Sequence, residues 1–421
     1  MISYITASPS PYHAVAEAVI ILEKAGFREL RETDPWNDAP GGRFLARGGT
    51  LIAWYTAPSV PAHAPFLIVA SRTDAPNLRV APAPDTSSVG WRQVRTEPYG
   101  SPALESWLDR DLGVSGRLAL RDGTSRLVCS DEALLRVART TGGTVSGVTP
   151  LWGLGGTERG ALLDRLAEEG GVDYYEVLGG DLMLHDVQAP GFLGAEREFV
   201  TSARLDDLVS VHAGLTALTR AADGEPAHIP VLVAFDGGAD GAPAHRTAAL
   251  LERTLRRAVA ARGGGHEDWC RALGGALAVH TRMVPAVHPD RPDRHDPEHR
   301  PLPNGGPVVT VGADGRGGTD GPGHALFAAA CERAGAPWQT YVRGPRSDEP
   351  SGAGPSIGAA LGIPSIEAGV AGLAGGTPRE LCGTDDPWLL ARVLLELAPT
   401  PAPHRTPPPP TRSPDLTESN G

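Results

Sequence analysis

The fold is decided by Phe66-Leu67-Ile68-Val69-Ala70, which runs directly into Ser71-Arg72-Thr73-Asp74. Five successive apolar residues are typical of a strand that is buried on both faces, as in a parallel sheet. Similar short apolar runs occur at three further places, namely Val231–Phe235, Val308–Val311 and Ser365–Ala368. We expect all four runs to be strands of one sheet.

Helical patterns separate these strands. The stretches Leu205–Leu218 and Ala244–Ala261 have the composition and spacing of helices. Another helix is expected near the start of the chain, where Ser10 can cap it, Pro11 suits its first turn and Gly26 suits its end. Strands that alternate with helices predict an α/β domain with a mainly parallel central sheet.

The pattern changes in the middle of the chain and again at its end. Residues 83–199 contain short β-like pieces and many turns, which predicts an inserted β-rich domain. The α/β domain would then be discontinuous and comprise residues 1–82 and 200–398. Residues 399–421 are rich in proline and nearly free of apolar side chains, so we expect a disordered tail.

Composition excludes several functional classes. The 421 residues carry a formal charge of −12, which argues against nucleic acid as the main partner. Of the 38 basic residues, only Lys24 is a lysine, and together with 53 glycines and 40 prolines this suggests a GC-rich genome. The four cysteines are far apart, so neither a zinc knuckle nor a disulfide framework is indicated.

We expect no targeting signal in this sequence. The first residues lack a basic region followed by an apolar run, and no apolar stretch approaches the roughly 20 residues that span a bilayer. We therefore expect a soluble cytoplasmic protein that binds neither membranes nor nucleic acid.

Polar clusters mark the expected position of a site. Three of the four apolar runs end in such a cluster or in a glycine-rich stretch, namely 71–74, 236–240 and 369–376. A fourth cluster, 202–207, opens a predicted helix. In open α/β sheets, ligands bind beyond the carboxyl ends of the strands. We expect these loops to form one pocket, and we expect 369–376 to be a turn.

Several ordered stretches resemble the M18 metallopeptidases, the aspartyl aminopeptidases. The matching stretches are SPSPYHAV from Ser8, RTDAPNLRV from Arg72, YGSPALESWLDRDLGVSGR from Tyr99, SARLDDL from Ser202, AVHPDRPDRHDPEHRPLPNGGPV from Ala286 and PRELCGTDD from Pro378. The resemblance extends from about Ser8 to Leu397. It implies a dinuclear-zinc peptidase-like α/β domain with an inserted β-rich domain for dimerisation, and dimers that build a tetrahedral dodecamer.

The chemistry of that family needs two zinc ions bridged by a carboxylate and a glutamate that acts as general base. The resemblance makes Asp206 the bridging carboxylate and Asp74 the residue that orients a ligand and the base. Most other positions differ from the family. Its HTD motif has become Arg72-Thr73-Asp74, and its HEE motif has become Gly237-Gly238-Ala239.

Two further family motifs are changed in the same way. The family's SADMAH corresponds to residues 280–285, with Arg282 at the aspartate position, and its MHS corresponds to residues 375–377, with Gly376 at the histidine position. The expected pocket is therefore lined by Arg72, Asp74, Asp206, Gly238, Ala239, Arg282 and Gly376. No catalytic residue and no metal site is intact in this set, apart from the ligand position Asp206.

These changes predict a catalytically inactive M18-like protein that works by binding, scaffolding or regulation, with no cofactor of its own. We expect it to form a homo-oligomer, with an active paralogue or another protein as a further partner. An active metallo-aminopeptidase or other hydrolase with a rearranged site is the alternative, and a sensor of small acidic ligands is a third interpretation. A hypothesis for the pocket is a salt-bridge network in which Arg72 and Arg282 replace the metal as partners of Asp74 and Asp206.

Three other motifs are weaker indications of a functional site. Residues 354–358 match the G-x-S-x-G pattern of serine hydrolases, but a polar loop stands where the required strand should be. His295 and His299 have the spacing of a zinc site, but Pro297 would disrupt the helix that such a site requires. His280 precedes Arg282 by two residues, so it could share a strand face with it and help to rebuild a site.

Overall fold

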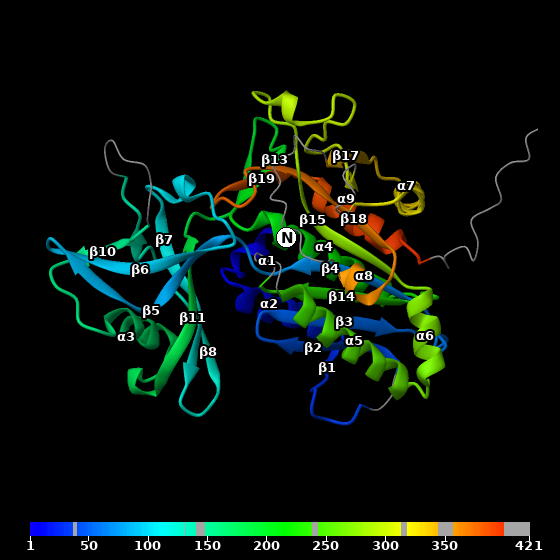
Figure 1. Ribbon diagram of the computed structural model, residues 1–421, viewed down its shortest axis with the longest axis horizontal. Coiled ribbons are helices and arrows are strands. Elements are labelled where there is room, and N and C mark those ends of the chain that lie inside the picture. Colours follow the sequence, from blue (N-terminus) through cyan, green and yellow to red (C-terminus); the bar gives the residue numbers. More distant parts are fainter. Residues whose placement is uncertain are drawn as a thin grey trace, which may run out of the picture.

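Two β-sheets with their covering helices make up the structure (Figure 1). The structure is a computed structural model, and it describes residues 1–36, 40–130, 132–139, 148–237, 243–312, 318–343 and 357–399. Within these ranges, one sheet has twelve strands and the other has seven. None of the helices in the described ranges is both long and apolar enough to cross a membrane.

The larger sheet has a parallel centre with antiparallel flanks. Its strands follow the order β1 (Arg28–Glu29), β2 (Gly41–Arg47), β3 (Thr50–Thr56), β14 (Ile229–Phe235), β4 (Phe66–Arg72), β15 (Leu277–Pro285), β18 (Ser365–Leu373), β19 (Glu380–Gly383), β13 (Phe199–Ser202) and β12 (Gly191–Leu193). Two more strands, β16 (Val308–Gly312) and β17 (Gln339–Arg343), pair beside β18. Strands β14, β4, β15 and β18 run parallel, which confirms the predicted α/β class.

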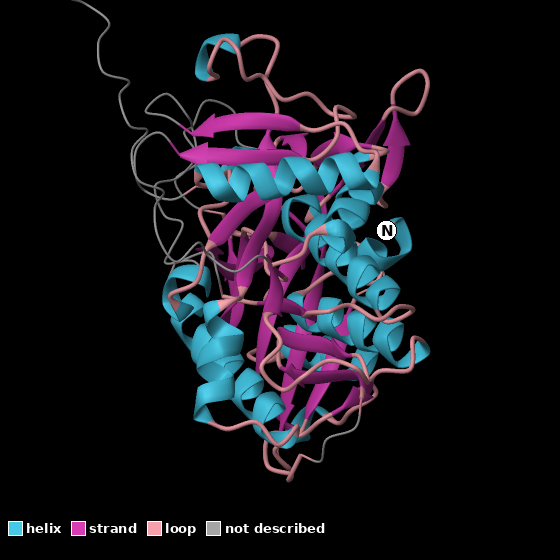
Figure 2. Ribbon diagram, turned by 90° about the vertical axis from the view of Figure 1, so that its right-hand side faces the viewer, coloured by secondary structure: helices cyan, strands magenta, loops and turns pink. Residues whose placement is uncertain are grey.

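Helices cover both faces of this sheet (Figure 2). One face packs against α1 (Ile2–Thr6), α2 (Pro11–Lys24), α4 (Leu205–Ala221), α7 (Gly321–Ala334) and α9 (Asp386–Glu396). The other face packs against α5 (Pro243–Ala261), α6 (His266–Gly274) and α8 (Ile357–Leu361). Side chains of β4 contribute to the hydrophobic cores on both faces of the sheet. Leu67 and Val69 face the first group of helices, while Phe66 and Ile68 face the second.

The second sheet is antiparallel and forms a separate β-rich unit beside the α/β unit (Figure 1). Its strands are β11 (Val177–Asp186), β5 (Asn77–Ser88), β6 (Trp91–Tyr99), β10 (Leu151–Leu154), β9 (Leu135–Arg136), β7 (Asp111–Leu120) and β8 (Ser125–Cys129). Because β11 also pairs with β7, the sheet curls back on itself. Its core includes side chains of α3 (Ala161–Gly170), and short 3-10 helices lie at η1 (Leu104–Trp107), η2 (Tyr174–Glu176) and, in the α/β unit, η3 (Pro292–Arg294).

Local sequence signals explain how α2 begins and ends. The Ser10 hydroxyl accepts a hydrogen bond from the backbone N–H of His13, and Pro11 occupies the first turn. Gly26, just beyond the helix, has a φ of +82°, a conformation that glycine adopts without strain. The predicted start and end of this helix are both confirmed.

One predicted turn is wrong in extent. We expected a turn over 369–376, but β18 continues to Leu373. A side chain at Gly369 would place its Cβ 1.5 Å from the carbonyl oxygen of Arg282 on β15. The glycine at this position is needed for close approach of two strands, which local sequence does not distinguish from a turn. The predicted tail, from residue 400 on, lies outside the described residues.

Candidate functional site

The predicted pocket lies where the parallel strands end. Strands β4, β14, β15 and β18 all point the same way, so their carboxyl ends meet at one edge of the sheet (Figure 1). Arg72 closes β4, Arg282 lies near the end of β15, and Gly376 lies in the loop after β18. Asp206 is in the first turn of α4. Gly238 and Ala239 lie outside the described residues, so their places in the pocket stay a prediction.

A bidentate ion pair between Arg72 and Asp207 forms the base of this site. Nε of Arg72 lies 2.8 Å from Oδ1 of Asp207, and Nη2 lies 2.9 Å from Oδ2. Asp74 is a more distant partner, with its Oδ1 3.9 Å from Nε. The side chain of Asp207 is only 1% exposed, and Asp207 raises the pKa of Arg72 well above its usual value. The guanidinium therefore stays charged and firmly held.

Asp207 was missing from the sequence-based hypothesis. That hypothesis gave Asp74 and Asp206 as the partners of Arg72, but the principal partner is the residue next to Asp206. Burial raises the pKa of the Asp207 carboxyl, and the guanidinium of Arg72 opposes that rise. Adjacent residues at a helix start point in different directions, so the choice between 206 and 207 needs the orientation of α4.

Asp206 is held by backbone contacts and by a buried glutamate. Its Oδ1 accepts a hydrogen bond from the N–H of Met283 at 3.0 Å. Its own N–H donates to Oε2 of Glu380 at 2.8 Å, and Oε1 of Glu380 accepts from the N–H of Gly376 at 2.7 Å. Burial raises the pKa of Glu380, and the charge of Asp206 adds to the rise. Sequence reasoning missed Glu380, although it lies in a stretch that carries the family resemblance.

Asp74 connects three parts of the molecule. Its Oδ2 accepts from the hydroxyl of Tyr99 at 2.5 Å and from the N–H of Gly237 at 3.0 Å. Tyr99 is on β6 of the β-rich unit, and Gly237 follows β14. Burial raises the pKa of Tyr99, and the nearby Asp74 charge adds to it, so the phenol stays protonated and remains a donor. Asp74 therefore ties the end of β4 to the neighbouring strand and to the inserted unit.

A pocket of about 430 Å³ opens beside Asp206. It is lined by Asp206, Arg282, Met283, Val284, Pro285, Ala286, His288, Arg291, Arg294, His295, Tyr341, Gly372, Leu373, Ala374 and Gly375. Three of these side chains are arginines and Asp206 is the one carboxylate among the lining residues described, so the lining favours anionic groups. Of the two predicted arginines, Arg282 lines this pocket, whereas Arg72 is absent from its lining.

The secondary motifs have structural contacts. Nε2 of His295 lies 3.1 Å from the carbonyl oxygen of Pro285, and Nδ1 of His299 lies 2.7 Å from Oδ1 of Asp296. His280 does not join Asp206, because its Nε2 accepts from the N–H of Gly358 at 3.4 Å, at the start of α8. Most of the G-x-S-x-G stretch, including Ser356, lies outside the described residues.

Comparison with known proteins shows the family. The family model described as "Aminopeptidase I zinc metalloprotease (M18)" matches residues 4–139 and 153–395. The "Probable M18 family aminopeptidase 2" of Streptomyces avermitilis is 47% identical over 415 residues, covering 94% of this chain and 96% of the relative. The protein of the same name from Mycobacterium leprae is 41% identical over 412 residues, covering 93% and 96%. The chain belongs to the M18 aminopeptidase family.

A solved structure agrees with this assignment. The mApe1 dodecamer of S. cerevisiae matches with a TM-score of 0.84 and 25% identity, over 94% of this chain and 94% of the other. The shared architecture confirms the fold that the sequence resemblance implied. It also shows that the α/β unit and the β-rich unit are both parts of the family fold.

The family match corrects one expectation and leaves a disagreement. We expected no cofactor, and this is wrong for the family, which is described as a zinc metalloprotease. The donors present do not fit a dinuclear zinc site: within the described residues, no group of three or more His, Cys, Asp or Glu side chains is placed to hold a metal ion. Arg72 stands instead at the position where the resemblance implies a histidine ligand. The described donors therefore support no zinc-dependent step at this edge of the sheet.

Proposed function

We propose that this M18 family member does not catalyse peptide hydrolysis and instead binds a small acidic ligand in the pocket beside Asp206. The observation that carries the first part is the bidentate pair between Arg72 and Asp207. A permanently charged guanidinium is fixed at the end of β4, at the edge where the reaction of the family would take place.

Loss of the general base supports the same conclusion. The family resemblance puts the proton acceptor at Gly238 and a further ligand at Ala239, and neither residue has a side chain that can accept a proton. Zinc binding and turnover are separate properties, because hydrolysis needs a base for the attacking water in addition to the metal. The proposal of inactivity therefore concerns turnover.

The test is an aminopeptidase assay on the full chain with aspartyl and glutamyl 4-nitroanilides. Zn²⁺, Co²⁺ and Mn²⁺ are added separately, and the M18 family aminopeptidase 2 of Streptomyces avermitilis is assayed in parallel for comparison. We expect no release of nitroaniline above buffer at any metal concentration. Release that scales with protein concentration and disappears in the Asp206→Asn variant would overturn the proposal.

The ligand class follows from the charges around the pocket. Arg282, Arg291 and Arg294 make the lining cationic, although Arg291 also pairs with Asp293 at 3.2 Å, while Asp206 offers a carboxylate to an α-ammonium group. A short peptide with an N-terminal acidic residue carries both charges on one small molecule. We therefore expect binding of Asp-Ala, weaker binding of N-acetyl-Asp-Ala and no binding of Lys-Ala.

Isothermal titration with these three dipeptides measures this selectivity. In the Arg282→Met variant the affinity for Asp-Ala should fall about tenfold or more, because hydrogen bonds to charged groups contribute about 1.5–3 kcal/mol. Arg300→Met is the matched control, since Arg300 is exposed and lies outside the pocket lining. Equal affinity for Asp-Ala and Lys-Ala would contradict the proposed ligand class.

We also propose that the chain forms a cytoplasmic homo-oligomer through its β-rich unit. The structural relative from S. cerevisiae is a dodecamer. On the β-rich unit of this chain, several large apolar side chains are exposed, among them Val89, Trp91, Leu154, Tyr175 and Leu178. Light scattering on the full chain should give a mass several times that of the monomer, and a monomer would contradict the proposal.

A further inference from the structure

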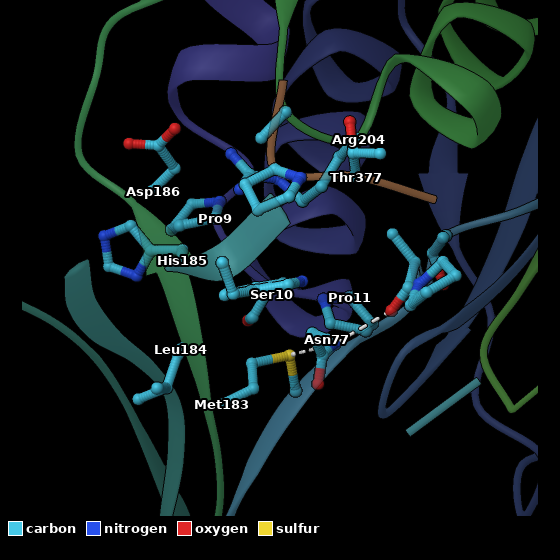
Figure 3. Close-up of a pocket in the computed structure, with 16 residues that line it drawn as sticks. Pro9, Ser10, Pro11, Asn77, Met183, Leu184, His185, Asp186, Arg204 and Thr377 are labelled. Carbon is cyan, nitrogen blue, oxygen red and sulfur yellow. Dashed lines mark hydrogen bonds between the residues drawn. The ribbon is translucent and has the colours of Figure 1, made fainter. Parts of the chain in front are cut away.

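A second, smaller cavity lies between the two units of the molecule (Figure 3). It has a volume of about 20 Å³. Its lining comes from the start of α2, from β5 and β11 of the β-rich unit, from η1, and from the loops before α4 and after β18. It is separate from the larger pocket, because no residue lines both.

Four buried polar atoms around this cavity hydrogen-bond to nothing within the described part of the chain. They are Oδ1 of Asn77, Nε1 of Trp107, Nδ1 of His185 and Nε of Arg204. The side chains are deeply placed, since Asn77 and His185 are each 7% exposed and Trp107 is 3% exposed. Buried polar groups in folded proteins nearly always have a partner, so four orphans around one cavity indicate a bound species.

The available hydrogens define the chemistry of that species. Nε1 of Trp107 and Nε of Arg204 can only donate. Nε2 of His185 faces Sγ of Cys129 at 3.9 Å, which leaves Nδ1 as the nitrogen available to a ligand. Asn77 already donates its amide to the carbonyl oxygen of Ala75 at 2.9 Å and so presents its oxygen. Of the four unpartnered atoms, two can only donate, Nδ1 of His185 donates in one of the two neutral tautomers, and Oδ1 of Asn77 accepts. The two fixed donors favour a species that accepts hydrogen bonds.

The charge states of the side chains around the cavity also favour an anion. In Figure 3, Arg204 and His185 lie on opposite sides of the cavity. Burial lowers the pKa of His185 to about 3, so its ring is neutral, and lowers the pKa of Arg204 only to about 10, so its guanidinium stays charged. His13 also lies near both groups, and burial lowers its pKa to about 4.

The nearby carboxylates are already occupied. Asp186 and Glu380 are close enough to raise the pKa of Arg204, although burial outweighs them. Asp186 accepts from Nη1 of Arg110 at 3.3 Å and from the N–H of Gln188 at 2.9 Å. Glu380 accepts from two backbone N–H groups. Within the described residues, no carboxylate forms an ion pair with Arg204, and a buried charge without a partner is costly.

We propose that this cavity binds a single halide ion, chloride under cellular conditions, between Arg204, Trp107 and His185. A volume of about 20 Å³ is enough for one species of the size of a water molecule or a halide ion. The ion neutralises the guanidinium and accepts from Arg204, from Trp107 and, in the tautomer with its proton on Nδ1, from His185.

The bound ion would join the β-rich unit to the base of the larger pocket. His185 belongs to β11, whereas Arg204 precedes Asp206 by two residues. Thr73 and Thr377 also line the cavity, and they are neighbours of Asp74 and Gly376. Occupancy would therefore stabilise the relative position of the two units. This inference is independent of the proposed acidic ligand, because the two cavities share no lining residue.

Crystals grown or soaked in bromide give the direct test. We expect one anomalous peak between Nε of Arg204, Nε1 of Trp107 and Nδ1 of His185 in the full chain. In solution, the melting temperature should rise with chloride in a saturable way, compared with gluconate at equal ionic strength. A cavity without an anomalous peak, together with equal melting in both salts, would mean that water fills it and would overturn the proposal.

Single substitutions test whether the stabilisation by chloride arises at this cavity. Arg204→Met should abolish the difference between chloride and gluconate, and Trp107→Phe, which keeps the aromatic ring but lacks the N–H, should weaken chloride binding about tenfold. Arg117→Met is the matched control, because Arg117 packs over the ring of Tyr12 between the same two units but does not line the cavity. If Arg204→Met fails to fold, Trp107→Phe decides. An unchanged chloride response in Trp107→Phe would place the ion elsewhere and contradict the proposal.

Discussion

Arg72 and Arg204 are both partly exposed arginines, and they differ in the partners of their guanidinium groups. Arg72 finds a carboxylate within the chain, with two hydrogen bonds of 2.8 and 2.9 Å to Asp207. Nε of Arg204 is buried close to the start of the same helix and hydrogen-bonds to no described residue. A buried positive charge needs a partner, which can be a side chain or a bound ion. Arg72 is therefore compensated within the described chain, whereas the proposed halide ion would supply the partner of Arg204.

The largest expected effect comes from breaking the completed pair. Arg72→Met should lower the free energy of unfolding by about 3–5 kcal/mol, because it leaves Asp207 buried without its partner. Chemical denaturation of the full chain measures this loss. Adding Asp207→Leu to Arg72→Met should recover most of the stability, since both charges are then gone. A loss below about 1 kcal/mol in the single variant would contradict a stabilising role for the pair.

A smaller effect is expected where Asp74 ties the units together. Tyr99→Phe removes the hydroxyl that donates to Oδ2 of Asp74 at 2.5 Å. A lost hydrogen bond to a buried charged group costs about 1–3 kcal/mol, measured by the same denaturation experiment. Tyr55→Phe is the control, because the hydroxyl of Tyr55 makes no hydrogen bond that the described residues show, and it should change stability by less than about 0.5 kcal/mol. Equal effects of the two substitutions would contradict this role of Asp74.

The smallest expected change in stability is that of Arg204→Met, and it distinguishes Arg204 from Arg72 most clearly. In gluconate without chloride, Arg204→Met should unfold within about 1 kcal/mol of the native chain, or be more stable, because it removes a buried charge that has no partner. This is the opposite of the expectation for Arg72→Met. Thermal unfolding of both variants in the same buffer makes the comparison. A loss similar to that of Arg72→Met would show that Arg204 is already neutralised within the chain.

Much of the fold was predictable because it depends on local patterns. Continuous apolar runs identified three of the four central strands, β4, β14 and β18, together with the flanking strand β16, but they did not identify β15. Ser10 with Pro11 identified the start of α2. The extent of β18 was not predictable, because Gly369 serves the close approach of β15 and not a turn. The domain boundaries at 83 and 199, the cytoplasmic location and the absence of nucleic-acid partners stay predictions.

Some residues of the candidate site could likewise be predicted from the sequence, and others could not. The sequence predicted one pocket lined by Arg72, Asp74, Asp206 and Arg282, and the structure brings these residues to one edge of the sheet. It could not choose Asp207 as the partner of Arg72, since the two residues are 135 positions apart and their approach depends on how α4 lies against β4. The expected absence of a cofactor rested on residue types alone, and the family match corrected it.

The sequence by itself determined most of the central strands and helices and the family resemblance, and it predicts the replacement of the family's site residues, because each of these depends on short stretches of consecutive residues. Only the tertiary structure decided which charges pair, which glycines permit close strand approach and where polar atoms remain without partners. Pairing and burial depend on segments that are distant in the chain. The unpartnered atoms around Arg204 come from Asn77, Trp107 and His185, and no local pattern relates these residues.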